Sequence, residues 1–191
     1  MSPTPKLDAP PRMTADEFLV WAEGRPGRYE LDAGAVVTMS PQRARHARAK
    51  SRVQRALERA LERGNLSCEA FADGMTVRVD RETVYEPDAL VQCGAYIDED
   101  AIEIADPIVV VEILSPSTRS IDSGEKLTGY FRIPSVQHYL IVDAVKRLII
   151  HHRRGDGDLI ETRIVAEGML RLDPPGLDLD LAGLFPARPP A

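Results

Sequence analysis

One short segment constrains the fold more than any other part of the chain. The run from Ile108 to Leu114 reads Ile-Val-Val-Val-Glu-Ile-Leu and is apolar at every position except Glu112. A short, β-branched and almost continuously apolar run is typical of a strand that is buried on both faces. The segment therefore predicts a layered domain in which this strand lies inside the sheet and carries a carboxylate into the interior.

A carboxylate in such a strand needs a compensating partner, because burying an unpaired charge costs several kcal/mol. Asp88 has a related setting, since it follows Pro87 and leads into the apolar run Ala89-Leu90-Val91. The 23 residues between Asp88 and Glu112 are enough to return the chain as an adjacent strand. Two acids on neighbouring strands can share a hard divalent cation such as Mg²⁺. Buried salt bridges, for example to Lys126 or an arginine, fit the same residues equally well.

The basic charge is concentrated in one predicted helix. The chain has 24 Lys and Arg against 30 Asp and Glu, a net charge of −6. Residues 43–63 hold eight basic and two acidic residues, so this segment carries +6 and the remainder −12. Steps of three or four place six arginines in one stripe on a helix: Arg45, Arg48, Arg52, Arg55, Arg59 and Arg63. Such a row suits the phosphates of DNA, although a solvated helix face has the same pattern.

The order of the other patterns predicts one mixed α/β domain. Thr14 and Glu17 form a capping box that begins a first helix, and a hairpin around residues 32–34 follows. Further strands are expected at 68–72, 75–79, 83–92, 138–143, 147–153 and 159–165, with a helix at about 120–132. We expect residues 1–12 to be a disordered proline-rich tail, 13–186 a single domain and 187–191 a frayed end.

Length and composition restrict the class of protein. A chain of 191 residues that is 43% hydrophobic can bury one core. No apolar run approaches the roughly 18 residues that a membrane span needs. Cys68 and Cys93 form neither a disulfide framework nor a metal motif, so a reducing cytoplasm is the expected location. His151 and His152 lack partner acids at metal-ligand spacing and are expected on the surface of a strand.

The acidic motifs resemble those of known nucleases. Pro87-Asp88, followed by Glu112 in an apolar strand, is similar to the acidic core of the PD-(D/E)XK nuclease superfamily. Residues 111–118 read Val-Glu-Ile-Leu-Ser-Pro-Ser-Thr and, with the spaced acid, lysine and tyrosine that follow, resemble the bacterial Uma-type restriction endonuclease family. The resemblance covers about residues 14–185 and implies a restriction-endonuclease-like fold, in which helices flank a mixed central sheet.

This resemblance implies a metal site and a displaced lysine. Asp88 and Glu112 would ligate Mg²⁺, or Mn²⁺, together with the backbone carbonyl of Ile113. In the superfamily's usual pattern a lysine stands two residues after the glutamate, where this chain has Leu114. Lys126 is the expected substitute, because it shares one face of the following helix with Asp122 and Tyr130. There it would polarise the attacking water or neutralise the phosphorane, unless it only pairs with Asp122.

Two further residues take roles from the same resemblance. Glu30, in the first hairpin, is similar to the additional acid that many superfamily members hold beside the metal. An ordinary exposed strand carboxylate explains Glu30 equally well. His46 follows the family's Ser-Pro…His pattern at the start of the arginine helix and would contact a phosphate, unless it is structural.

Together these features predict a Mg²⁺-dependent endonuclease that hydrolyses DNA. Arg45, Arg48, Arg52 and Arg55 would hold the DNA backbone through phosphate contacts, and a homodimer would account for paired strand cuts. The missing lysine at Leu114 keeps an alternative open, a catalytically silent nuclease-fold module that binds DNA or a protein partner. A second alternative is a metal-free core in which Glu112 simply pairs with Lys126.

Overall fold

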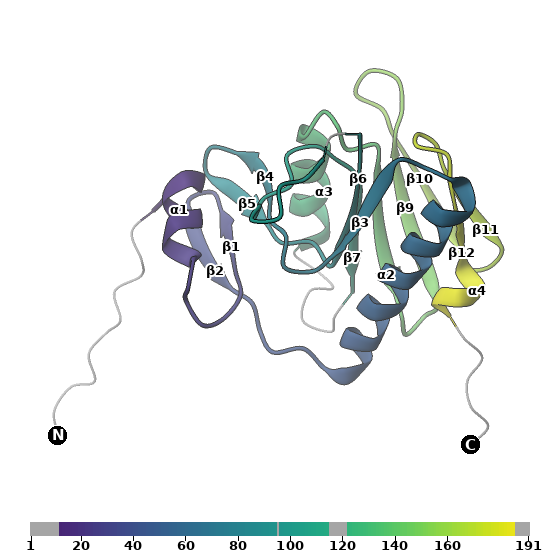
Figure 1. Ribbon diagram of the computed structural model, residues 1–191, viewed down its shortest axis with the longest axis horizontal. Helices are drawn as coiled ribbons and strands as arrows, with labels where there is room; N and C mark the ends of the chain where they lie inside the picture. The colour runs from purple at the N-terminus through teal and green to yellow at the C-terminus, as the bar shows by residue number, and fades with distance from the viewer. Residues whose placement is uncertain (1–11, 95, 115–121, 186–191) are drawn as a thin grey trace, which may run out of the picture.

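A six-stranded mixed sheet forms the centre of the molecule, and helices lie on both of its faces (Figure 1). The computed structural model describes residues 12–94, 96–114 and 122–185, so most of both predicted tails lies outside the described residues. In chain order the elements are α1 (Ala15–Ala22), β1 (Tyr29–Asp32), β2 (Ala35–Thr38), α2 (Ala44–Gly64), β3 (Cys68–Ala72), β4 (Val77–Asp80), β5 (Thr83–Tyr85), β6 (Ala89–Cys93), β7 (Pro107–Ile113), α3 (Asp122–Arg132), β8 (His138–Asp143), β9 (Leu148–Arg154), β10 (Ile160–Val165), β11 (Met169–Leu172), β12 (Leu177–Asp180) and α4 (Leu181–Leu184).

The central sheet has the strand order β10-β9-β8-β7-β6-β3. Its one parallel pair is β7 and β8, and α3 forms the crossover that a parallel connection requires. The strand that contains Glu112 therefore lies in the interior of the sheet, between β6 and β8, as its apolar sequence predicts. The predicted mixed sheet flanked by helices is confirmed.

Alternate residues of β7 face two separate hydrophobic cores. Val109 and Val111 pack with the apolar side of α2 and with β11, β12 and α4. Val110 packs on the other face with Tyr130 of α3. Side chains alternate along a strand, so Glu112 lies on the same face as Val110 and points toward α3.

The predicted strand at 83–92 is in fact two strands, which belong to different sheets. β5 joins a smaller sheet of order β2-β1-β5-β4, whereas β6 joins the central sheet. The chain crosses between them at Glu86, Pro87 and Asp88. Pro87 has no N–H to donate to a strand partner, which favours a break there. The crossing places Asp88 at the beginning of β6, where the two sheets meet.

Two predictions about polar side chains are wrong. Cys68 and Cys93 are directly opposite each other on the antiparallel strands β3 and β6 and form a disulfide. They therefore give no support to a cytoplasmic location, which stays a prediction. His151 and His152 are buried, and His151 bonds His138 at 2.9 Å, because β9 lies inside the sheet. No helix in the described parts of the chain is long and apolar enough to cross a membrane.

Candidate active site

Asp88 and Glu112 meet at one end of the central sheet. The antiparallel register of β6 and β7 pairs Ala89 with Val111, so the next residues along, Asp88 and Glu112, come opposite each other. The backbone N–H of Ile113 donates a hydrogen bond of 2.7 Å to Oδ2 of Asp88. The return of the chain as an adjacent strand, expected from the spacing of the two acids, thus brings the two carboxylates close enough for the charge of Asp88 to raise the pKa of Glu112.

Glu112 is bonded by two side chains of α3. Its Oε1 lies 2.9 Å from Nζ of Lys126 and accepts a hydrogen bond of 2.8 Å from the hydroxyl of Tyr130. Lys126 and Tyr130 are four residues apart, so they lie on the same face of the helix. Burial raises the pKa of Glu112 to about 7, since the charge of Lys126 only partly offsets desolvation and the nearby acids Asp88 and Glu30 add to the rise.

Lys126 stands between two carboxylates. Besides Glu112, its Nζ contacts Oε1 of Glu30 at 2.8 Å and lies 5.3 Å from the ring centroid of Tyr85. Burial alone would lower the pKa of Lys126, but the two adjoining carboxylates raise it, so the amine is charged. It approaches Glu112 on the face of β7 that also carries Leu114, where the motif lysine is expected. The side chain of Asp122, its other expected partner, lies outside the described residues.

Glu30 is part of this group rather than an exposed strand residue. It is 8% exposed, and its Oε1 accepts a hydrogen bond of 2.9 Å from the backbone N–H of Glu86 as well as the contact from Lys126. β1 therefore contributes a carboxylate to the junction of the two sheets.

Two side chains of α2 contact the carboxylate of Asp88. Its Oδ1 lies 2.6 Å from Nζ of Lys50, and its Oδ2 lies 3.4 Å from Nε2 of His46. Burial by itself would raise the pKa of Asp88, but the hydrogen bond from His46 and the charge of Lys50 outweigh it, so the pKa lies below its usual range. His46 is thus close to the acid pair, at the beginning of the arginine helix.

Sequence reasoning missed Lys50 as a site residue. Lys50 is one of the eight basic residues of 43–63, and its charge suggests an exposed side chain, yet this side chain is only 6% exposed. The signal was present in the spacing, because Lys50 stands three residues before Val53 and seven before Leu57. Both of these pack in the core, so the helical period already turns Lys50 inward.

The arginine stripe lies on the outer side of α2. Arg45, Arg48 and Arg55 are exposed and Arg52 is half-buried. Within the described part of the chain, the side chains of Arg45, Arg48 and Arg52 make neither a hydrogen bond nor an ion pair, whereas that of Arg55 bonds the hydroxyl of Ser51. The side chains of the stripe lie outside the group formed by Asp88, Glu112 and Glu30. The stripe begins next to this group, because His46, which contacts Asp88, lies on the first turn of the same helix.

The acid pair suits a hard divalent cation. Asp88 and Glu112 present carboxylate oxygens from adjacent strands, the ligand type that Mg²⁺ prefers. Their negative charges repel each other, so the charge of Asp88 raises the pKa of Glu112. Among the described residues, no three His, Cys, Asp or Glu side chains gather as a metal cluster. Lys126 separates Glu30 from Glu112, so a metal would draw on two carboxylates, backbone oxygen and water.

Comparison with known proteins places this arrangement in a family. The family model described as "Uma2: Putative restriction endonuclease" matches residues 15–183, nearly the whole chain. The chain belongs to this family. The membership confirms the resemblance drawn from residues 111–118 and from the acids at 88 and 112, and it supports a nuclease function for the chain.

Two curated proteins and one solved structure are also similar to this chain. Two uncharacterised proteins of Synechocystis sp. (strain PCC 6803) are 28% and 26% identical to the chain over 87% and 81% of its length, covering 88% and 89% of their own. The crystal structure of a "putative nuclease belonging to DUF820" from Anabaena variabilis superposes with a TM-score of 0.70. At 19% identity, over 91% of this chain and 97% of that one, it shows a shared fold. The restriction-endonuclease-like class is therefore confirmed.

Proposed function

We propose that this protein is a metal-dependent endonuclease that hydrolyses phosphodiester bonds of DNA. The observation that carries the proposal is the meeting of Asp88 and Glu112 at the end of adjacent strands, with the charged amine of Lys126 2.9 Å from Glu112. Membership of a restriction endonuclease family supports the reaction class. Asp88, Glu112 and the backbone carbonyl of Ile113 would hold Mg²⁺, with Mn²⁺ as a substitute.

Each residue around this proposed centre has a separate role. Asp88, Glu112 and the Ile113 carbonyl would hold a metal that lowers the pKa of water and stabilises negative charge at phosphorus. Lys126 places a permanent positive charge beside Glu112, where it can orient the attacking water or neutralise the phosphorane. Glu30 holds the lysine amine in place, and Tyr130 fixes one oxygen of Glu112.

The outer side of α2 would bind the DNA backbone. Arg45, Arg48, Arg52 and Arg55 offer guanidinium groups at steps of three or four residues. Contacts of this kind give affinity and register without reading bases. His46, between the stripe and Asp88, would contact a phosphate close to the scissile one.

One observation favours a second candidate, a catalytically silent module that binds DNA or a protein partner. Leu114 occupies the usual lysine position, and each carboxylate of the pair already has a lysine counter-charge, Lys50 on Asp88 and Lys126 on Glu112. In that case the acids would serve only the stability of the fold.

A plasmid assay separates these functions. Supercoiled DNA is incubated with Mg²⁺ or Mn²⁺ and with wild type, Asp88→Asn or Glu112→Gln, which keep the shape and remove the charge. We expect wild type to nick the plasmid and each variant to lose about a hundredfold or more of the rate. Glu69→Gln, an exposed carboxylate on β3, is the matched control and should behave as wild type.

Two results contradict the proposal in different ways. If wild type cuts with neither metal, the silent module replaces the enzyme. If the Asp88 and Glu112 variants cut as fast as wild type, the nuclease activity belongs to another site.

A further inference from the structure

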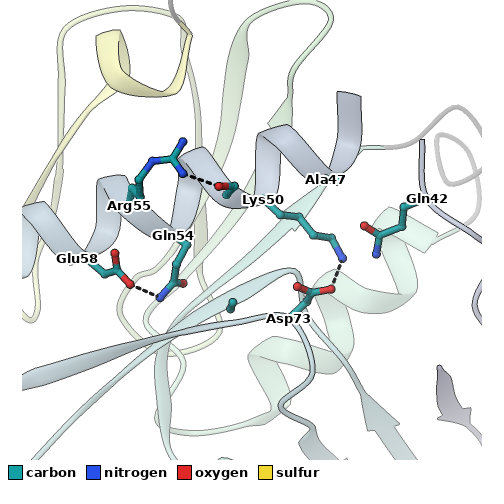
Figure 2. A pocket seen from close by; sticks show the side chains of 9 residues that line it. Gln42, Ala47, Lys50, Gln54, Arg55, Glu58 and Asp73 are labelled. Carbon is teal, nitrogen blue, oxygen red and sulfur yellow. Dashed lines mark hydrogen bonds and ion pairs between the residues drawn. The ribbon is translucent and has the colours of Figure 1, made fainter. Parts of the chain in front are cut away.

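Lys50 is a buried cation that the proposed reaction does not use. It lies on α2, its side chain is 6% exposed, and its Nζ bridges Oδ1 of Asp88 at 2.6 Å and Oδ2 of Asp73 at 2.9 Å. Figure 2 shows the side chain extending from the helix toward Asp73, with Gln42 beside it. With its amide turned to the orientation that satisfies its hydrogen bonds, the oxygen of Gln42 accepts from the same amine at 2.5 Å.

These three acceptors match the three N–H groups of an ammonium. Asp73 is itself held in place by Arg28, which contacts it at 2.9 Å and continues to Glu86 at 2.6 Å. If Lys50 leaves Asp88, it therefore keeps a fixed carboxylate and an amide oxygen as partners. The charge of the amine stays compensated, and only one of its three contacts is lost.

The space for such a movement is present. Lys50, Gln42 and Asp73 line a pocket of about 400 Å³ between α2 and the turn that follows β3 (Figure 2). Asp73 and Gln42 line this pocket and Asp88 does not, so the open space adjoins the two partners that the amine would keep.

We propose that the Lys50 ammonium pairs with Asp88 while no divalent metal is bound. When a metal binds Asp88, the ammonium moves away from it and keeps only Asp73 and Gln42 as partners. This inference rests on the proposed metal site. A metal on Asp88 would share this carboxylate with the ammonium, which lies 2.6 Å from it, and the two positive charges would repel each other. Without a metal, the same ammonium compensates a buried carboxylate that would otherwise be costly. Lys50 thus stabilises the metal-free protein and lowers its affinity for the metal.

Calorimetric titration of the full chain with Mn²⁺ tests this role. Lys50→Met removes the competing charge, so we expect the Kd for Mn²⁺ to fall about tenfold. Asp73→Asn removes the acceptor to which the amine withdraws, so we expect the Kd to rise. Lys146→Met removes a lysine charge from the exposed turn between β8 and β9 and should leave the Kd unchanged. Lys50→Gln, which retains a hydrogen-bond donor, is the second variant if Lys50→Met does not fold.

The outcomes distinguish this inference from the function on which it rests. Heat in wild type with an unchanged or higher Kd in Lys50→Met, or in Lys50→Gln, overturns the role of Lys50 and leaves the metal site standing. If no protein, wild type included, gives heat with Mn²⁺, the metal site itself is overturned and the competition proposed for Lys50 with it.

Discussion

At the scale of single residues, the site depends on pairs of side chains that only a fold can bring together. Lys126 and Glu112 are 14 residues apart, yet their contact requires α3 to pack at one particular position along β7. A glycine on α3 allows this close approach. A Cβ atom on Gly129 would stand 2.7 Å from the ring of Tyr85, so α3 lies directly on this ring, which also faces the amine of Lys126.

Gly129→Ala should therefore loosen the site as well as the fold. Tyr85 cannot move away easily, because it is buried and packs edge-on against Tyr130 at 5.3 Å. Overpacking costs about 1–3 kcal/mol and helix propensity returns about 1 kcal/mol, so urea denaturation should show a net loss of up to about 2 kcal/mol. Gly124→Ala, with nothing within 4 Å of its Cβ, should gain up to about 1 kcal/mol. Equal shifts for the two variants would contradict this packing.

At the scale of elements, the two sides of the arginine helix differ in what they contact. Its inner side packs on the sheet through Val53, Leu57 and Leu61, and at its beginning it brings His46 and Lys50 to Asp88. Its outer side carries the stripe. The spacing of apolar and basic residues predicts the helix and both sides. It does not predict the partner of Lys50, because Asp73 lies in a turn whose position depends on the pairing of β3 with β6.

Charge reversal on this helix tests its role in binding. Arg48→Glu with Arg52→Glu should weaken binding to duplex DNA and lower the slope of log K against log salt by about 2, since each phosphate contact contributes about 0.9. Fluorescence anisotropy at several salt concentrations measures both quantities. Arg81→Glu with Arg163→Glu, two exposed arginines outside α2, makes the same change in net charge and serves as the control. A salt slope that stays at the wild-type value removes the stripe from the account.

At the scale of the whole molecule, most of the layered arrangement follows from sequence patterns, and the exceptions have a common cause. The interior strand, the arginine helix and the adjacency of Asp88 and Glu112 are all predictable, because they depend on local apolar runs and chain length. The division of 83–92 between two sheets and the bond between Cys68 and Cys93 are not, since both depend on which strands pair over long distances. Glu30 illustrates the same limit, as its burial follows from the small sheet lying against α3.

The proposed function requires that Asp88 and Glu112 together hold a divalent metal. A crystal soaked in Mn²⁺ and measured for anomalous scattering tests it most directly. The account predicts an anomalous peak in contact with carboxylate oxygens of both Asp88 and Glu112, with Lys126 still beside Glu112. A crystal with no peak at this position, and with Lys50 and Lys126 still bonded to the two acids, would contradict it and leave a salt-bridged core in place of a metal centre.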